Sequence, residues 1–358
     1  MSARDSRAWV EVSLAAVVEN ARTVARTAGA RLLPIVKANA YGLGAVAVSG
    51  ALEAVDPWGY GVATIEEGAE LRAAGIARRI LVLLPATPGR FASYRELRLT
   101  PVFDEPTALR AWAGNGDGDP FHIEIDTGMA RGGVRWDEVE RIASLTDTPG
   151  FEGAFTQLHS SECADGTTGQ QLERFLTALA RLPRRPKLRH VANSAAALRD
   201  PTCALDLVRP GVFLYGGSPG GGVQPGRPVA SVRARVVSVR RVQPGDGVSY
   251  NARWIAPRET TIATLGIGYA DGVPATLGPD GQGQVLLRGT RCPIVGTVTM
   301  DLTLVDAGAV PVEVGDVATL LGEADGQRIT LAELSTASGV QPRGLLTALG
   351  PRLPRVYA

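Results

Sequence analysis

The sequence predicts an α/β fold, with an N-terminal (β/α)8 barrel of the TIM type followed by a mostly-β C-terminal domain. Three observations support this prediction. In the first half of the chain, short apolar runs typical of buried strands alternate eight times with helical patterns. A segment rich in glycine and proline then interrupts the alternation near residue 220. Beyond it, β-branched residues alternate with polar ones between turns, and a total of 358 residues leaves room for two domains.

The first helix of the predicted barrel has a clear start signal, because Ser13 is a good N-cap and apolar residues then follow at helical spacing. We expect strands at 31–36, 59–64, 79–84, 101–103, 121–125, 151–158, 188–192 and 207–214. Further helices are expected at 45–55, 66–74, 106–112, 136–145, 169–182 and 195–198. An open doubly wound sheet is the alternative, but Gly42-Leu43-Gly44 is too weak a match to the glycine fingerprint that such a sheet needs.

Composition predicts the domain boundaries. We expect the cofactor-binding barrel at 9–217, a Gly/Pro-rich linker at 218–228 and the β-rich domain at 229–358. In the second domain, strands are expected at 231–242, 260–265, 284–287 and 297–305, with a turn at 279–281.

Bulk properties exclude several classes of partner. The net charge is +1 and no basic stripe with interleaved aromatic residues occurs, so neither nucleic acid nor a membrane surface is expected. No run approaches the roughly 20 apolar residues of a membrane span, and the first residues do not resemble a secretory signal. Cys163, Cys203 and Cys292 lack paired spacing, which indicates free thiols. Together these features predict a cytoplasmic protein.

Lys37 is the most informative single residue. It ends the apolar run Pro34-Ile35-Val36, and the chain continues into small residues, a tyrosine and a glycine. Lysine occurs elsewhere only at Lys187, because the other residues in the Lys+Arg total are all arginines. An ammonium group can lose its proton and attack a carbonyl, whereas a guanidinium stays charged. Lys37 therefore indicates carbonyl chemistry, and the alternative is an ordinary surface lysine that extends to solvent.

Reactive residues of a barrel lie at the carboxyl ends of its strands. In this sequence those ends carry Lys37 and Tyr41, the segment 126–131, Gln157, His159 and Ser160, Asn193 and Ser194, and the segment 209–211. A lysine, two arginines, hydroxyl groups and backbone amides suit a phosphorylated carbonyl cofactor and a carboxylate substrate. The three histidines are dispersed along the chain, so no metal site is expected.

Seven motifs in this order resemble those of the alanine racemases, which are pyridoxal-phosphate enzymes built from a barrel and a β domain. The resemblance covers nearly the whole chain. The motifs are Val36-Lys37-Ala38-Asn39-Ala40-Tyr41-Gly42, Asp126-Thr127-Gly128-Met129-Ala130-Arg131, Ala192-Asn193-Ser194, Val208-Arg209-Pro210-Gly211, Val248-Ser249-Tyr250, Ile267-Gly268-Tyr269-Ala270-Asp271-Gly272 and Gly296-Thr297-Val298-Thr299-Met300-Asp301. Each motif is weak alone, but their order across both domains makes coincidence an inadequate explanation.

The resemblance implies that pyridoxal 5'-phosphate is the cofactor and that Lys37 holds it covalently. It places Arg209 against the pyridine nitrogen, where an arginine that keeps its proton would leave the nitrogen unprotonated. The cofactor phosphate would bind to the hydroxyl groups of Tyr41 and Ser194 and to the backbone amides near Gly211 and Val212.

The resemblance also implies an isomerase, an alanine racemase that supplies D-alanine for peptidoglycan. A proton must leave one face of a planar carbanion and return on the other, so two bases are needed, Lys37 and Tyr250. Tyr250 and Met300 would come from the partner subunit of a homodimer. Arg131 would bind the substrate carboxylate, while Tyr269 and Met300 would narrow the entrance.

Three positions depart from the family pattern. Glu124 stands where many members have a carbamylated lysine, and we expect its carboxylate to support Arg131 directly. Gln157 stands where a histidine usually stacks on the cofactor, although His159 follows two residues later on the same side of an extended strand. The segment Arg343-Gly344-Leu345-Leu346 lacks the expected tyrosine and glutamate.

Other readings of the sequence remain open at this stage. One is a racemase with a broader or serine-type amino-acid range. Another is a pyridoxal-phosphate carrier without catalysis, whose relatives lack the β domain that carries Tyr250. A barrel-fold decarboxylase would share Lys37 but would need different residues at the β-domain motifs. The exact substrate range and dimer stability do not follow from the sequence.

Overall fold

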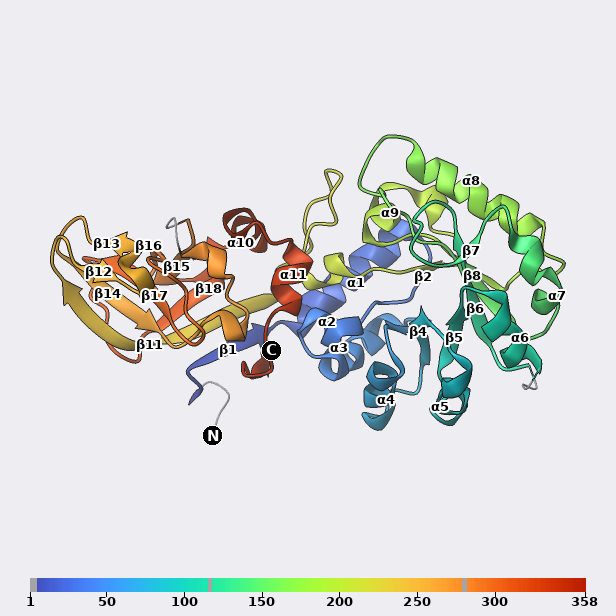
Figure 1. The fold of residues 1–358 in the computed structure, drawn as a ribbon, viewed down its shortest axis with the longest axis horizontal. Helices are drawn as coiled ribbons and strands as arrows, with labels where there is room; N and C mark the ends of the chain where they lie inside the picture. The colour runs from blue at the N-terminus through green and yellow to red at the C-terminus, as the bar shows by residue number, and fades with distance from the viewer. Residues whose placement is uncertain (1–4, 115–117, 279–281) are drawn as a thin grey trace.

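The computed structural model describes residues 5–114, 118–278 and 282–358, and it places the barrel and the β-rich domain at opposite ends of an elongated molecule (Figure 1). Both halves of the predicted fold class are confirmed. No helix in the described ranges is long and apolar enough to cross a membrane.

The barrel is a ring of parallel strands. In ring order they are β2 (Arg31–Leu32), β3 (Gly59–Val62), β4 (Arg79–Pro85), β5 (Thr100–Phe103), β6 (Phe121–Asp126), β8 (Phe151–Phe155), β9 (Leu188–His190) and β10 (Leu207–Val208). Strands β10 and β2 pair with each other, and single bridges from Ile35 to Gly61 and from Asn193 to Arg209 join this pair to β3 and β9. All of these pairings are parallel, so the carboxyl ends of the strands meet at one mouth.

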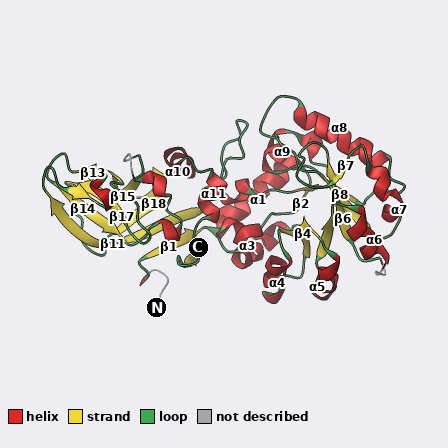
Figure 2. Ribbon diagram, in the orientation of Figure 1, coloured by secondary structure: helices red, strands yellow, loops and turns green. Residues whose placement is uncertain are grey.

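Helices surround the strands (Figure 2). They are α1 (Leu14–Ala28), α3 (Ala45–Leu52), α4 (Ile65–Ala73), α5 (Phe91–Glu96), α6 (Pro106–Gly114), α7 (Ala143–Thr146), α8 (Thr167–Ala180) and α9 (Ser194–Arg199). The predicted cap of α1 is confirmed, since the Ser13 side chain accepts a hydrogen bond from the backbone N–H of Ala16. Helix α4 begins with a full capping box between Thr64 and Glu67.

Several predicted barrel elements are longer than the observed ones, and the two that differ most lie at 136–145 and 207–214. The helix expected at 136–145 is a 3-10 turn at Val139–Ile142 followed by the single turn α7, and Val134–Arg135 forms an extra strand, β7, beside β6. The strand expected at 207–214 ends after Val208, because Pro210 and Gly211 interrupt it and a 3-10 helix, η6 (Val212–Tyr215), follows.

The second domain is mostly sheet. Its strands are β11 (Ala230–Val242), β12 (Gly247–Val248), β13 (Trp254–Ile255), β14 (Thr260–Leu265), β15 (Gln284–Leu287), β16 (Thr290–Pro293), β17 (Thr303–Gly308), β18 (Val317–Ala324), β19 (Gln327–Ile329) and β20 (Arg355–Tyr357). The N-terminal strand β1 (Ala8–Val12) also joins this sheet, because it pairs with β11 and β20.

Two findings in the second domain differ from the expected pattern. The strand expected at 297–305 begins only at Thr303, since residues 297–302 form a loop. Two short helices, α10 (Leu331–Ser338) and α11 (Pro342–Thr347), lie between the last strands. The turn expected at 279–281 lies outside the described residues.

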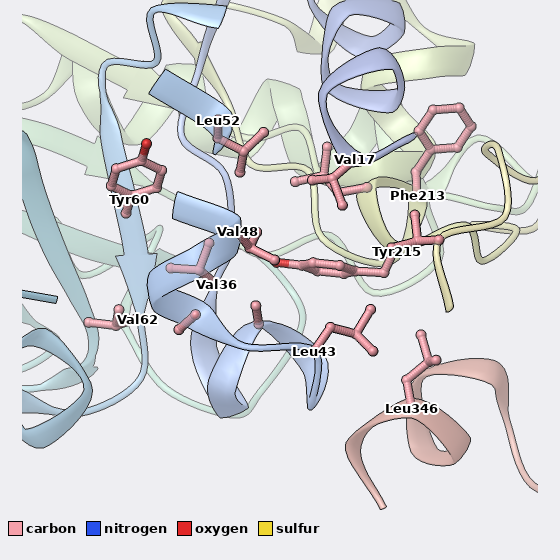
Figure 3. Packing of buried hydrophobic residues seen from close by; sticks show 14 of the residues in the cluster. Val17, Val36, Leu43, Val48, Leu52, Tyr60, Val62, Phe213, Tyr215 and Leu346 are labelled. Atoms are coloured by element: carbon pink, nitrogen blue, oxygen red, sulfur yellow. The ribbon is translucent and has the colours of Figure 1, made fainter. Parts of the chain in front are cut away.

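A continuous apolar core lies beneath the segment 37–42 (Figure 3). Tyr215 of η6 lies there close to Val17, Val48 and Leu346. Its hydroxyl group donates a hydrogen bond to the carbonyl oxygen of Ile35 at 2.7 Å, in a fully buried position. The core therefore supports the lysine segment from below, with residues from α1, α3, η6 and α11.

Candidate active site

A large pocket opens at the mouth formed by the carboxyl ends of the barrel strands. It gathers every barrel residue that the sequence singled out for cofactor or carboxylate binding. These lining residues are Lys37, Tyr41, Arg131, Ser194, Arg209, Gly211 and Val212. Among the described residues no group of three or more His, Cys, Asp or Glu side chains could hold a metal ion.

Lys37 begins a turn, α2 (Lys37–Tyr41), with an unusual backbone. The four residues Ala38 to Tyr41 all have φ between 51° and 55°, in the left-handed region. Each such residue costs about 1–2 kcal/mol when it carries a side chain. The turn is held by Glu67 of α4, whose carboxylate accepts hydrogen bonds from the backbone N–H of Ala38 at 2.6 Å and of Ala63 at 2.6 Å.

The Lys37 amine is half-buried and faces the pocket. No hydrogen bond or ion pair of this amine occurs in the described ranges of the chain. Burial lowers the pKa of Lys37 below 10.5, the nearby Arg131 and Arg209 guanidinium groups lower it further, and Glu67 opposes them. At a given pH near neutrality, Lys37 thus has a larger neutral and nucleophilic fraction than an ordinary lysine.

Hydroxyl groups and backbone amides gather beside Tyr41. The backbone N–H of Gly211 donates to the hydroxyl oxygen of Ser194 at 2.9 Å. A Cβ atom on Gly211 would lie 2.5 Å from the hydroxyl oxygen of Tyr41, so only glycine lets that hydroxyl approach. Ser194 is fixed by Asn193, which caps α9 by accepting hydrogen bonds from the two N–H groups that follow Ser194. The arrangement offers a concave set of donors suited to a phosphate.

Arg209 is buried, with 5% of its surface exposed. Its guanidinium donates to the carbonyl oxygens of Thr156, His190 and Val191, and it lies over the ring of Phe155 at 5.1 Å. Burial lowers its pKa to about 10, which still keeps the group charged at neutral pH. Arg209 can therefore donate hydrogen bonds but cannot supply a proton to a neighbouring base.

Two buried histidines continue from Arg209 into the barrel. The guanidinium donates to Nδ1 of His190 at 3.0 Å, so the proton of that ring is on Nε2, which lies 2.8 Å from Nδ1 of His122. Nε2 of His122 then faces the Glu152 carboxylate at 3.5 Å, beyond good hydrogen-bonding distance. Burial lowers the pKa of both histidines, so both rings are neutral. The neutral ring of His190 therefore accepts a hydrogen bond from Arg209 and adds no second positive charge beside it.

Arg131 has the exposure and charge needed for substrate binding. Its side chain is 62% exposed and lies 4.0 Å from the carboxylate of Glu124, which is buried on β6. Burial raises the pKa of Glu124, and Arg131 opposes this increase. The loop itself is shaped by Asp126, whose carboxylate accepts hydrogen bonds from the backbone N–H groups of Gly128 and Ala130.

Gln157 and His159 both line the pocket, as their spacing predicts. The Gln157 side chain lies 3.5 Å from the Arg209 guanidinium and donates to the carbonyl oxygen of Leu158. The His159 ring contacts the hydroxyl group of Ser160 at 2.7 Å.

The three site residues predicted in the second domain do not line this pocket. Tyr250, Tyr269 and Met300 are 69%, 47% and 53% exposed. Their segments lie side by side, because Ser249 donates to the carbonyl oxygen of Thr297 and the backbone of 269–270 pairs with that of 299–300. Strands β12 and β13, which flank Tyr250, lie at the end of the molecule away from the barrel (Figure 1).

Comparison with known proteins identifies the family. The model for the alanine racemase N-terminal domain matches residues 12–219, and that for the alanine racemase C-terminal domain matches residues 229–357. The chain belongs to the alanine racemase family. It is 39% identical over 372 residues to the alanine racemase of Symbiobacterium thermophilum, an alignment that covers 98% of this chain and 96% of that one.

Solved structures of alanine racemases have the same architecture. That from Streptomyces lavendulae is 32% identical with a TM-score of 0.91, covering 99% of this chain and 97% of that chain. That from Bartonella henselae has covalently bound pyridoxal phosphate and is 30% identical with a TM-score of 0.90, covering 99% and 100%. As an alanine racemase family member, the chain is a pyridoxal-phosphate-dependent racemase, an isomerase that acts on an amino-acid substrate.

The pocket of this racemase family member fits the cofactor. The Lys37 amine suits the aldehyde of the cofactor. The Tyr41 hydroxyl group, for which Gly211 makes room, suits its phosphate, and the buried Arg209 suits its ring nitrogen. Sequence reasoning missed Glu67, which holds the lysine turn, and Arg355, whose guanidinium donates to the carbonyl oxygen of Gly42 at 2.7 Å. Only the capping box at Thr64–Glu67 could have drawn attention to Glu67.

Proposed function

We propose that this protein interconverts L-alanine and D-alanine by a two-base mechanism. The observation that carries the proposal is that the two candidate proton-transferring groups, Lys37 and Tyr250, lie on different surfaces of the chain. One chain holds an amine, Lys37, in a pocket beside the guanidinium groups of Arg131 and Arg209, and it exposes a phenol, Tyr250, on a different surface. A racemase needs two proton-transferring groups that approach one carbon from opposite sides.

Different pocket residues would bind different parts of the cofactor. Lys37 would attach to its aldehyde, Arg209 would face its ring nitrogen, and Tyr41, Ser194 and the amides of Gly211 and Val212 would bind its phosphate. When bound, pyridoxal phosphate supplies an electron sink that makes an α-proton of an amino acid acidic. The depressed pKa of Lys37 supports its role, because an amine that is partly neutral can accept that proton.

Tyr250 would act on the opposite face of the α carbon, as the phenol of a second copy of the chain. Its exposure and its absence from the pocket of its own chain support this assignment. A symmetric homodimer would bring Tyr250 of each copy to Lys37 of the other, and would also bring Met300 and Tyr269 to the entrance. These side chains would then restrict the pocket to a small substrate such as alanine.

Arg131 would bind the carboxylate of the amino acid. Its exposed guanidinium has room to form a paired contact with an incoming carboxylate, while the carboxylate of Glu124 stabilises its charge from behind. The two groups would fix the α carbon between Lys37 and Tyr250. The product D-alanine would serve peptidoglycan synthesis in the cytoplasm, where the free thiols of Cys163, Cys203 and Cys292 would stay reduced.

Hydrogen exchange and covalent trapping test this function together. The enzyme incubated with L-alanine in heavy water should exchange the α-hydrogen and form D-alanine, and Lys37→Ala should lose about 10²–10⁴-fold or more in rate. Borohydride reduction followed by mass spectrometry should find the cofactor on Lys37. An adduct on Lys187, or exchange that survives Lys37→Ala, would contradict the proposal. A panel that includes L-serine separates alanine racemisation from a broader specificity.

A further inference from the structure

Arg343 contributes a positive charge to the pocket from the second domain. It lies in α11, and with Gln341 and Pro342 it lines the same pocket as the barrel residues. Its side chain is exposed. Within the ranges that the structure describes, its guanidinium has no hydrogen bond and no ion pair. A free arginine in a pocket wall is available for an anion.

The packing of α11 fixes Arg343 at one end of the pocket. The helix is pressed against the lysine turn, because a Cβ atom on Gly42 would lie 2.4 Å from the carbonyl oxygen of Leu346. Pro342 lies beside Gly217, just after η6, where an added Cβ atom would be 3.8 Å from the proline ring. Gly217 in turn lies against Val212, the first residue of η6, so Arg343 lies at the end of the pocket that Tyr41 and Val212 line.

Different charged side chains act on the two ends of the pocket, the end at Lys37 and the end at Tyr41. The charges that act on the Lys37 amine are those of Arg131, Glu67 and Arg209. The charge that acts on the Tyr41 hydroxyl group is that of Arg343, which opposes the increase in the pKa of Tyr41 caused by burial. Two arginines thus serve the reactive end of the pocket, and a third serves the end at which Tyr41, Ser194 and the amide of Gly211 gather.

We propose that Arg343 is a cofactor-binding residue whose guanidinium pairs with the phosphate group beside Tyr41 and Ser194. This inference rests on the proposed phosphate site. Because α11 belongs to the second domain and the other phosphate ligands belong to the barrel, bound cofactor is held from both domains of one chain. The contact also makes cofactor retention depend on ionic strength, since the arginine is exposed to solvent.

The test measures cofactor retention directly. Purified holoenzyme is dialysed against graded concentrations of pyridoxal phosphate, and the loaded fraction is measured from the absorbance of the bound cofactor. Arg343→Ala should raise the dissociation constant about tenfold, as expected for loss of a charge-assisted contact. Arg343→Lys should recover most of the loss, and raising the ionic strength should weaken the wild type more than Arg343→Ala. Arg185→Ala, which removes an exposed arginine outside the pocket, is the matched control.

The outcomes distinguish the possible anions. If Arg343→Ala and Arg343→Gln keep the wild-type dissociation constant, the inference is wrong. If they keep it but raise the KM for alanine, Arg343 binds the substrate carboxylate instead, and the inference is also wrong. If the wild type retains cofactor on Lys37 and the Arg343 variants bind it equally well, only the inference about Arg343 fails and the proposed function stands. A wild type that retains no cofactor refutes both proposals.

Discussion

At the scale of single residues, Lys37 and Arg209 differ in their hydrogen-bond partners, and this difference suits them to different roles. The Lys37 amine has no partner in the described part of the chain, while Arg209 is surrounded by carbonyl oxygens and by the neutral ring of His190. Burial makes the amine less basic and leaves the guanidinium charged. The same desolvation therefore gives one group the ability to exchange protons and leaves the other as a fixed donor.

Glu124 provides a prediction at this scale. Changing Glu124→Gln removes a buried carboxylate 4.0 Å from the Arg131 guanidinium while keeping its shape. We expect the KM for alanine to rise about two- to fivefold, which corresponds to the roughly 0.4–1 kcal/mol of a partly exposed ion pair. Steady-state kinetics with saturating cofactor measure this change. Glu19→Gln, which removes an exposed carboxylate on α1, is the control, and an unchanged KM and kcat in Glu124→Gln would discard this role.

The sequence could predict which residues meet at the mouth but not what supports them. Strand ends and motif order were sufficient to place Lys37, Arg131 and Arg209 in one pocket. Glu124 was expected beside Arg131, but the contacts behind Lys37 and Arg209 were not predictable, because Glu67 reaches Ala38 across 29 positions and His122 reaches His190 across 68. Such contacts depend on tertiary packing rather than on a local pattern.

At the scale of elements, the left-handed turn at 38–41 is the feature that the sequence did not reveal. Alanine has no preference for this conformation, so nothing in Ala38 or Ala40 predicts it. The turn persists because its surroundings hold it: Glu67 binds its start, Arg355 binds the carbonyl oxygen of Gly42, and Tyr215 supports it from the core. By contrast, helices and strands with strong periodicity, such as α1 and β14, agree with their predicted positions.

Gly42 provides the prediction for this element. Gly42 has φ of 84° and touches the backbone of α11, so Gly42→Ala should lower the free energy of unfolding by about 1–3 kcal/mol. Gly50 is the matched control, because it lies inside α3 with open space where a Cβ atom would lie, and Gly50→Ala should raise the free energy of unfolding by about 0.5–1 kcal/mol. Urea unfolding of the holoenzyme at one fixed protein concentration measures the change in the free energy of unfolding for both variants. Equal stabilities for the two variants would show that the turn does not depend on Gly42.

At the scale of the whole molecule, the two halves are joined more closely than composition suggests. We propose the division into a barrel at 9–217, a linker at 218–228 and a β-rich domain at 229–358. The strand β1 nevertheless pairs with β11 and β20, so the chain begins in the sheet of the second domain before entering the barrel. The linker was predicted from its glycine and proline content, but Ser218, Pro219 and Gly220 also line the active-site pocket.

The exposed end of the β domain carries Tyr250, so it bears on whether one chain alone can form a complete active site. Tyr250 lies between non-glycine residues with positive φ, Ser249 at 65° and Asn251 at 58°, so its loop holds a strained shape although the Tyr250 side chain is 69% exposed. We therefore propose that each active site takes Lys37 from one copy of the chain and Tyr250 from another.

Subunit complementation tests this claim most directly. Lys37→Ala and Tyr250→Phe chains, each inactive alone, are produced together with different tags, and the mixed dimers form one site that contains both an intact Lys37 and an intact Tyr250. Random pairing makes about half of the dimers mixed with one intact site in each, so racemisation of L-alanine should recover to about a quarter of the wild-type rate. If Lys37 and Tyr250 instead served the same site from one chain, the mixture would stay as inactive as the two variants, and the shared active site would be contradicted.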